Sequence, residues 1–526
     1  MKLYIDIDGV LLNYDTDSRA EHSVELIDYI TEEFDCYWLT THCKGDGKPA
    51  VEYLSRYFPN ETIQKLRKIK PTYWEDMKTD GIDFDSDFIW LDDYPFQAEL
   101  SVLRNFCAEK SLYRVNLSNK DELLNVMTFL KGIKEKKRKR RTMVLTIILS
   151  FLLALGIGKA IWSCIANRYL GNFETEKTDI LKRRNFLINE VIAQPSDLIS
   201  KMPAAVGEQF QGEWALYSAS MLTAALTNIS MIYPETRHEA AKSIDSLIKI
   251  VMAPEIRRYD YQRWGEDPLE TLDGDESHIS YLSHLAWMIS AYNYTCSDGK
   301  YDRLFSELCE TMNRRILLSP HLNLQTYPGE LIYVPDMLVA IVALANYSRQ
   351  NDGKYCPTVH QWLDEMKTNW IDPTSGLLAS FIPYDGLLSS ISLPVKGSYS
   401  ALNCYYLTFI DEEFARDQYE ILKTWFLNTK PITGFKEYFD RNCWLGIDID
   451  AGPILFNLSP TGTAFGIGSI TYFEDFDLRK KFLKTAELAG FTVTKGDKRH
   501  YLLADVALVG ESITLAMRTA VKWEYK

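Results

Sequence analysis

The sequence lacks the cysteine spacing of small metal-binding or disulfide-rich domains. Its nine cysteines are spread over 526 residues, and no two of them form a CxxC pair. This pattern argues against a zinc ribbon and against a dense disulfide framework. The sequence also has fewer basic than acidic residues: 58 lysines and arginines against 72 aspartates and glutamates, which gives a net charge of −14. That balance argues against a nucleic-acid partner for the protein as a whole.

The composition shows no bias toward disorder. Apolar residues make up 46% of the chain and charged residues 25%, as in globular proteins. The length predicts roughly three to four structural units. The 31 tyrosines and 12 tryptophans lie mostly after residue 200. Aromatic side chains in such numbers can line a concave ligand site, although large aromatic cores are the commoner explanation.

One segment is strongly basic and is followed by a long apolar run. Residues 131–141 read KGIKEKKRKRR, with eight basic residues and one acid. The 24 residues from 143 to 166 carry one charge, Lys159, near the far end. They are long enough to cross a hydrocarbon core of about 30 Å, and the lysine can reach the headgroups. We therefore predict a transmembrane helix over 143–166 after a basic juxtamembrane segment, 131–142. A buried helix of a soluble domain is the alternative.

The basic flank also predicts the orientation of the chain. Positively charged segments beside a membrane span remain in the cytoplasm. We expect a single-pass protein of a bacterial inner membrane, with the N-terminal part cytoplasmic and the C-terminal part extracytoplasmic. The position of the apolar run is wrong for a cleaved signal peptide, which would lie at the N-terminus. The lipid membrane is thus an expected partner.

Two aspartates follow the first apolar stretch, in the segment YIDIDGV. Asp6 and Asp8 are two residues apart, so in a strand both carboxylates would point to the same face. Like charges that close repel unless a cation or a shared proton compensates. An Asp-Gly turn is the simpler alternative.

Strand-like stretches alternate with helical ones over the first 130 residues. The later stretches are DCYWLTTH, DFIWLDDYPF and SLYRVNLS. The alternation predicts an α/β domain over 1–130 with a doubly wound parallel sheet. Sites in such sheets form at the carboxyl ends of the strands. Polar residues are found at those ends: Asp6, Asp8, Thr40, Asp92 and Asp93.

This pattern resembles the haloacid dehalogenase-like superfamily, most of whose members are phosphohydrolases. The matching features are DIDGV, LTT, Lys78 and WLDD. The resemblance implies that Asp6 is the nucleophile that takes the phosphoryl group and that Asp8 is the acid/base. It also implies that Thr40 binds the phosphoryl oxygens and that Lys78 offsets the charge of nucleophile and phosphate. The expected partner is a phosphorylated substrate on the cytoplasmic side.

The same resemblance implies a Mg²⁺ site. Its ligands would be Asp6, the backbone carbonyl of Asp8, and Asp92, with Asp93 as a further candidate. Carboxylate oxygens at two strand ends suit the octahedral geometry that Mg²⁺ prefers. Only about 30 residues separate Asp8 from Thr40. This leaves no room for a large cap, so we expect a minimal cap and an open site.

Three alternatives remain open for this domain. Lys68 and Lys70 lie near Lys78 in sequence and could take its place, and Thr41 could replace Thr40. The segment THCKGDGKPA could cover the site as a small flap or be an ordinary loop. The whole domain could also be a degenerate scaffold that keeps the strands without turnover.

Beyond the membrane segment, residues 167–210 read as a charged helical connector, and 211–526 read as paired helices with few strands. The pairing predicts an all-α (α/α)6 toroid of about twelve helices. An α-solenoid is the alternative, but no fixed-length repeat is visible. The expected helices are 213–230, 236–252, 277–292, 300–316, 335–350, 357–369, 397–409, 411–427, 460–473 and 475–489, with two more by 522.

The long loops of this part are rich in acids and aromatic residues. Such groups suit sugar or terpenoid chemistry, where cationic intermediates need acids, bases and apolar walls. The alternative for Asp275 and Asp336 is that each caps the helix that follows it. The candidates for the toroid cavity are Trp264, Asp275, His278, Tyr281, Tyr333, Asp336, Tyr384, Asp448 and Asp450.

The C-terminal part loosely resembles the linalool dehydratase/isomerase-like proteins, which are extracytoplasmic α/α toroids. Segments such as DESHISYLSHLAWMISAY and DIDAGPILFNLSPTGTAFGIGS carry the resemblance. It implies an acid/base role for Asp275, His278 and Tyr281 in a lyase or isomerase acting on a small apolar or sugar-like molecule. A glycosidase and a non-catalytic module that binds a small ligand are the alternatives.

Overall fold

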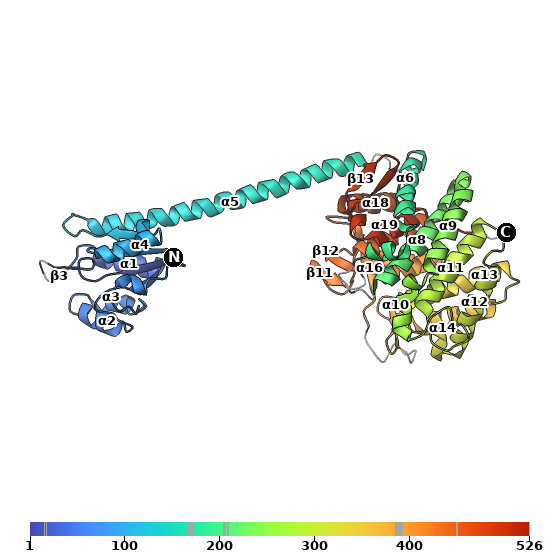
Figure 1. Cartoon of the computed structure of the whole chain (residues 1–526), viewed down its shortest axis with the longest axis horizontal. Helices are drawn as coiled ribbons and strands as arrows, with labels where there is room; N and C mark the ends of the chain where they lie inside the picture. Colours follow the sequence, from blue (N-terminus) through green and yellow to red (C-terminus); the bar gives the residue numbers. More distant parts are fainter. Residues whose placement is uncertain are drawn as a thin grey trace. The chain divides into compact units, whose positions relative to one another are not determined.

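The computed structural model describes residues 1–14, 16, 18–166, 170, 173–203, 207, 210–383, 393–448 and 451–524. Two of the predicted site residues, Tyr384 and Asp450, lie outside these ranges. The chain forms two compact units, Met1–Ala154 and Leu155–Lys526 (Figure 1).

The N-terminal unit contains the predicted parallel sheet, which is small. Its strand order is β4-β1-β5-β6, and every neighbouring pair is parallel. In the register, Lys2 lies opposite both Asp35 and Phe88. The strands are β1 (Lys2–Ile5), β4 (Asp35–Trp38), β5 (Phe88–Asp92) and β6 (Leu112–Arg114). The helices are α1 (Ser23–Glu33), α2 (Lys48–Leu54), α3 (Asn60–Leu66), α4 (Gln97–Asn105) and the start of α5 (Glu122–Ala166), with η1 (Lys78–Gly81), η2 (Glu109–Ser111) and the hairpin β2 (Leu12–Asn13)–β3 (Ser18–Arg19).

Helices cover both faces of this sheet. On one face, Leu3 and Ile5 of β1 pack with Ile27 of α1 and Val126 of α5. On the other face, a smaller apolar cluster comprises Tyr4, Trp90 and Leu103, the last from α4. Strands that are buried on both faces are typical of doubly wound α/β sheets. The strand ends are thereby held rigidly, which positions the side chains that follow them.

Helix α5 carries an apolar surface that no part of the described chain covers. Its most apolar window has a mean hydropathy of 2.3 and is 0% buried. One other described helix is long and apolar enough to cross a membrane, α8 (Gln211–Ile232), but 83% of its window is buried. Burial of that extent is typical of a core helix in a soluble domain. The two helices therefore have different surroundings.

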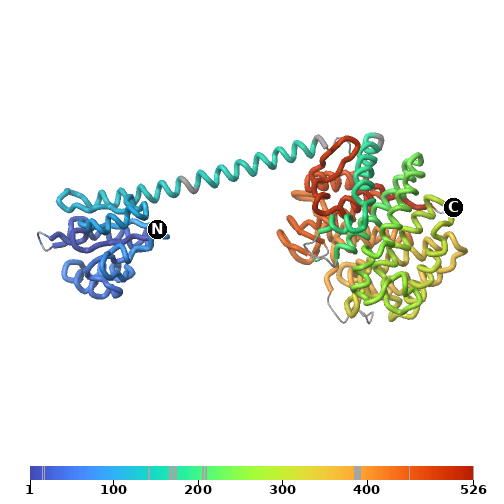
Figure 2. The backbone as a smooth tube through the Cα atoms, viewed as in Figure 1, coloured from blue at the N-terminus to red at the C-terminus, as the bar shows by residue number. Residues whose placement is uncertain are grey.

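The C-terminal unit is a closed ring of helices. Figure 2 traces its backbone, coloured from green to red along the sequence. Within the described ranges, six inner helices each pack against the next, and the last packs against the first. The closure confirms a toroid-like arrangement and excludes an open solenoid. The inner helices are α8, α11 (Ile279–Thr295), α13 (Val334–Gln350), α15 (Gly397–Leu407), α17 (Pro460–Tyr472) and α19 (Leu508–Arg518).

Further helices pack outside the inner ring, and short hairpins connect them. The helices are α6 (Phe173–Val191), α7 (Pro195–Ser200), α9 (Arg237–Val251), α10 (Pro254–Trp264), α12 (Asp302–Leu318), α14 (Cys356–Asn369), α16 (Glu412–Phe426) and α18 (Phe476–Gly490), with η5 (Pro234–Thr236), η6 (Pro320–Leu322) and η8 (Leu502–Asp505). The hairpins are β9 (Leu427–Asn428)–β10 (Gly434–Phe435), β11 (Leu445–Asp448)–β12 (Gly452–Leu455) and β13 (Thr492–Lys495)–β14 (Lys498–Tyr501). The strands β7 (Ile332–Tyr333) and β8 (Phe381–Ile382), which α13 and α14 separate in the chain, also pair antiparallel.

Two sequence-based expectations for this unit were wrong. Residues 173–191 are not a free connector, because α6 packs against β14, α8 and α19. Within 491–522, the structure has the β13–β14 hairpin and the single helix α19 where two helices were expected. The strands Thr492–Lys495 and Lys498–Tyr501 pair antiparallel around a turn that contains Gly496. The positive φ of Gly496 is one that glycine adopts readily in a tight hairpin turn.

Candidate functional site

Three carboxylates meet at the carboxyl edge of the parallel sheet. One ligand oxygen from each of Asp6, Asp92 and Asp93 lies within 4.8 Å of the others. Asp6 follows β1 and Asp92 ends β5, and the two strands are adjacent. The strand-end pattern in the sequence predicted this meeting. All three are acids that Mg²⁺ could use as ligands.

Lys78 lies between two of these carboxylates. Its Nζ is 2.5 Å from Asp6 Oδ2 and 2.5 Å from Asp92 Oδ2. Its backbone amide donates to Glu99 Oε1 at 2.8 Å, which fixes η1 against α4. Although burial lowers the pKa of Lys78, the Asp6 and Asp92 carboxylates raise it overall. Lys70, one alternative, pairs with Asp35 instead, so the geometry favours Lys78.

Burial and crowding raise the pKa of two acids in this cluster, Asp92 and Asp93. The pKa of Asp92 rises to about 7, first because the group is buried and then because Asp6 is near. The pKa of Asp93 is raised for the same two reasons. Acids crowded in this way bind a divalent cation readily, since the cation removes the repulsion between them.

Asp8 points to a different partner. Its Oδ2 lies 2.9 Å from Nε2 of His42, and the His42 ring stacks on Tyr53 with centroids 4.1 Å apart. The expectation that Asp6 and Asp8 share one face of a strand was wrong, because β1 ends at Ile5 and both aspartates follow it. The sequence reasoning also missed His42, which stands in the segment THCKGDGKPA, for which a small flap and an ordinary loop were both open.

Gly9 and Thr40 complete the immediate surroundings. Gly9 has φ +73, and a Cβ added there would lie 2.1 Å from Cγ of Asp93. The acid therefore packs directly over the glycine backbone. Thr40 is fully buried, and its Oγ1 accepts the backbone N–H of His42 at 3.5 Å. Thr41 is exposed, which favours Thr40 of the two alternatives.

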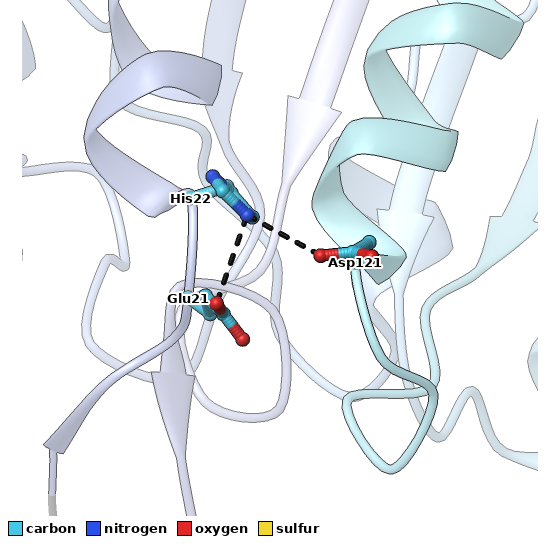
Figure 3. Close-up of side chains that lie close together, drawn as sticks. All are labelled: Glu21, His22 and Asp121. Carbon is cyan, nitrogen blue, oxygen red and sulfur yellow. Dashed lines mark ion pairs between the residues drawn. The ribbon is translucent and has the colours of Figure 1, made fainter.

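A second acid–histidine group in this unit is exposed and self-contained. His22 Nε2 lies 3.8 Å from Glu21 Oε1 and 3.5 Å from Asp121 Oδ1 (Figure 3). A hydrogen bond to Glu25 is the main cause of its raised pKa. The surrounding acids therefore favour the protonated form of His22.

In the C-terminal unit, Asp336 is buried in the first turn of α13. Its Oδ1 accepts from the Tyr217 hydroxyl at 3.1 Å and its Oδ2 from the Thr326 hydroxyl at 2.5 Å. Burial, and to a lesser degree Glu213, raise its pKa to about 6. Tyr333 occupies the N-cap position, without a capping hydrogen bond from its side chain, so the alternative that Asp336 is the N-cap was wrong.

Glu213 lies in the first turn of α8 and was not predicted. Arg263 donates to its Oε2 at 2.9 Å, and Ser280 of α11 donates to its Oε1 at 3.0 Å. Tyr327, whose hydroxyl lies 3.4 Å from Oε2, stacks over Arg263. First turns of parallel inner helices gather at one end of a ring, where the positive ends of their dipoles favour carboxylates.

Two buried polar atoms beside Asp336 lack partners among the described residues. They are Nε2 of His284 and the hydroxyl of Tyr406. Nδ1 of His284 is held by Ser220 at 2.8 Å, and its ring lies 4.3 Å from the ring of Tyr217. Burial lowers the pKa of His284 to about 3, so the imidazole is neutral near pH 7. The inner helices thus offer free hydrogen-bonding atoms close to a buried acid.

The residues matched to the dehydratase/isomerase roles have separate partners. Asp275 is 93% exposed at its side chain and pairs with Arg314, and the cap of α11 is His278 rather than Asp275. His278 is buried and paired through Nδ1 with Asp260. The Tyr281 hydroxyl donates to a backbone carbonyl, that of Val251, at 3.0 Å. The capping alternative for Asp275 was therefore wrong as well.

The remaining candidates line other parts of the ring. The Trp264 ring lies 5.8 Å from that of His278. Tyr333 joins an aromatic cluster with Tyr327 at 5.4 Å and Phe381 at 5.1 Å. Asp448 accepts from Lys396 at 3.0 Å and from Tyr438 at 2.6 Å.

The sequence matches no protein-family model and no curated protein. Among solved structures, a family 105 glycoside hydrolase of C. acetobutylicum ATCC 824 aligns with 57% of this chain and 92% of its own, at 12% identity and a TM-score of 0.39. An unsaturated glucuronyl hydrolase specific for heparin aligns with 65% of this chain and 96% of its own, at 10% identity and a TM-score of 0.42. Similarities this low assign a role to no residue of this chain.

Proposed function

We propose that the N-terminal unit is a Mg²⁺-dependent phosphohydrolase. The observation that carries the proposal is the buried cluster of Asp6, Asp92 and Asp93 around Lys78. A carboxylate can attack phosphorus only when its charge and that of the phosphate are masked. The three acids and the backbone carbonyl of Asp8 would hold Mg²⁺, which supplies that masking when bound. Lys78 contributes a fixed positive charge beside the nucleophile.

In this mechanism Asp6 forms a bond to phosphorus as the bond to the leaving oxygen breaks. Asp8 gives its proton to that oxygen, and an aspartyl phosphate results. Asp8 then takes a proton from water, whose oxygen attacks phosphorus and releases phosphate from Asp6. His42, 2.9 Å from Asp8, orients the acid for both transfers, and Thr40 binds a phosphoryl oxygen. With only α1, β4 and a small hairpin between Asp8 and Thr40, the site suits a bulky phosphate.

The test uses the full chain in detergent and a panel of aryl, sugar and nucleotide phosphates. Wild type should release phosphate with Mg²⁺ and stop when EDTA is added. Asp6→Asn should be inactive, because an amide is a poor nucleophile, and Asp8→Asn should be slower by about 10²–10⁴-fold. Asp121→Asn, in the exposed acid–histidine group, is the matched control and should keep full activity. If wild type and Asp6→Asn both fail to release phosphate from every member of the panel, the scaffold alternative is favoured.

For the C-terminal ring we infer a glycosidase, on the geometry of Asp336. A buried acid with a pKa of about 6 holds its proton at mildly acidic pH and can give it to a glycosidic oxygen. Glu213, which pairs with Arg263 at 2.9 Å, is the second carboxylate that such chemistry needs. A lyase or isomerase could use the same acid, and a binding module would use the aromatic residues alone.

A panel of aryl glycosides and oligosaccharides, given to the full chain, separates these possibilities. Asp336→Asn should abolish hydrolysis, whereas Asp275→Asn, an exposed acid of the same unit, should leave it intact. Binding of a sugar without turnover in wild type would support a binding module. Equal turnover in wild type and Asp336→Asn would contradict the role given to this acid.

We also propose that residues 143–166 cross a membrane, with the N-terminal unit in the cytoplasm. The support is the basic segment 131–141 and the exposed apolar surface of α5. An apolar helix that is exposed all round would be costly in water and is stable in lipid.

A further inference from the structure

The last turns of α5 contact the C-terminal unit, of which they are part. The indole N–H of Trp162 donates to the backbone carbonyl of Thr492 at 3.1 Å. Its ring stacks on Phe491 with centroids 5.8 Å apart and planes 6° from parallel. Nζ of Lys159, one turn earlier on α5, lies 6.0 Å from the centroid of the Phe491 ring. The end of the apolar helix is thus fixed against the start of the β13–β14 hairpin.

Exposed apolar side chains continue from this contact. The backbone amide of Leu502 donates to the carbonyl of Phe491 at 3.0 Å, so η8 lies beside the stacked pair. Leu502, Leu503 and Val506 are 49%, 53% and 66% exposed. We refer to Trp162, Phe491, Leu502, Leu503 and Val506 together as the lipid-facing surface. Its apolar groups have no role in either proposed site.

A second exposed apolar group lies on the same side of the unit. The hairpin β11–β12 and the strand β13 both lie on the side that α5 joins (Figure 1). Ile447 at the centre of β11 is 89% exposed, and Trp444 packs edge-on against Phe456 at 5.1 Å. Exposed apolar groups that gather on one side of a domain mark an interaction surface.

We propose that the C-terminal unit rests on the bilayer through the lipid-facing surface. The inference rests on the proposed membrane span. Lipid is the occupant because the surface continues an apolar helix that is itself uncovered, and a bilayer around that helix would reach these side chains. Tryptophan beside lysine is typical of the boundary between hydrocarbon and headgroups. Lys495 and Lys498 of the adjoining hairpin can pair with anionic headgroups.

The test is photochemical labelling of the full chain in phosphatidylethanolamine and phosphatidylglycerol vesicles. A phosphatidylcholine with a diazirine close to its glycerol is added, and labelled peptides are located by mass spectrometry. Label should be found in 143–162, in 491 and in 502–506. Leu317 and Leu318 of α12, which are exposed to a similar extent, are the internal control and should remain unlabelled.

A triple variant tests whether the apolar side chains at 502, 503 and 506 make the contact with lipid. Leu502→Ser, Leu503→Ser and Val506→Ser together should remove the label from 491 and 502–506 and leave the label in 143–158. Absence of label in 502–506 of wild type, with 143–158 labelled, would overturn the inference while the span stands. Absence of label in both would overturn the span. Equal label at Leu317 and Leu318 would show nonspecific contact and would also overturn the inference.

Discussion

Asp93 reaches the other two carboxylates of the N-terminal unit because residue 9 has no side chain. The space that a Cβ would fill at Gly9 is occupied by the Asp93 carboxyl, with Cγ and Oδ2 both 2.1 Å away. The φ of +73 at this glycine is also one that other residues adopt only with strain. The close approach of backbone and acid thus depends on a single missing methyl group.

Gly9→Ala should therefore weaken metal binding as well as stability. The displaced Asp93 should raise the Mg²⁺ concentration needed for half-maximal phosphatase activity. The strained backbone should cost about 1–3 kcal/mol, measured by urea unfolding of the N-terminal unit. Gly45→Ala in the same unit is the control for strain alone, because Gly45 has φ +85 and an added Cβ would lie at an ordinary contact distance, 3.4 Å, from the Tyr73 ring. An unchanged Mg²⁺ requirement in Gly9→Ala would contradict the placement of Asp93 as a ligand.

Glu437 predicts a pH dependence in the C-terminal unit. The side chain is fully buried, its Oε1 accepts from the Ser398 hydroxyl at 2.8 Å, and burial raises its pKa to about 7. An unfolded glutamate titrates near 4.3, so the folded state holds the proton more tightly between about pH 4.3 and 7. The free energy of unfolding should fall as pH rises through this range, by at most about 1.4 kcal/mol per pH unit.

The measurement is hydrogen exchange of peptides from α15 at pH 5 and pH 8, corrected for the intrinsic rates. Glu437→Gln imitates the protonated acid, so it should equal wild type at pH 5 and be more protected at pH 8. Glu307→Gln, an exposed acid on α12, should change neither value. If protection in Glu437→Gln depends on pH as it does in wild type, a group other than Glu437 causes that dependence.

At the residue scale, motifs made the N-terminal acids predictable. Asp6, Asp92 and Lys78 each lie at a strand end or loop with a recognisable order along the chain. Glu213 and Glu437 are single acids in segments that otherwise read as ordinary helix or loop, and only packing from distant parts gives them partners. His42 could have been suspected, because it follows the threonine pair in a short Gly-rich loop.

At the element scale, α6 shows why a charged pattern misleads. Its sequence reads as a solvated helix, yet Arg183 is buried and pairs with Glu511 at 2.7 Å and Glu487 at 2.9 Å. Arg518 of α19 is buried as well and pairs with Asp179 and Glu176 of α6. Charges buried in such a network are satisfied only when every member is present.

Arg183→Leu should destabilise the C-terminal unit by about 3–5 kcal/mol, because it leaves carboxylates buried without a counter-charge. Urea unfolding followed by hydrogen exchange of α6 and α19 peptides measures the effect. Arg303→Leu removes an exposed pair with Glu307 and should change stability by less than about 0.5 kcal/mol. If both variants lower the free energy of unfolding by similar amounts, the buried network contributes no more to stability than a surface pair.

The helices of the ring were predictable where apolar residues recur at helical spacing over more than ten residues. Their expected bounds agree with α8, α9, α11 to α18 within a few residues. Helix α10, PEIRRYDYQRW, was missed because charged and aromatic residues break its apolar spacing. Closure of the ring depends on packing between α8 and α19, about 300 residues apart, which no local pattern contains.

At the scale of the whole molecule, the proposed topology separates the two activities by a membrane. A reporter enzyme that works only outside the cytoplasm should be active when fused after residue 526 and inactive when fused before residue 1. A reporter that works only in the cytoplasm should show the opposite pattern. Replacing the basic residues of 131–141 by glutamine should weaken this asymmetry, because positive charge keeps the flank inside. Activity of both reporters at the same end would contradict a single span.

The ring is closed by α19, the last of its six inner helices along the described chain. Arg183 meets Glu511, 328 residues later in the chain, and α19 fills the gap beside α8. At about 5–20 residues per second, α6 and α8 would wait roughly 15–65 s for their partners. During that time their buried charges and apolar faces are open to proteases and to other nascent chains. A premature stop codon before α19 would therefore leave the ring open and the buried charges of α6 without their partners on that helix.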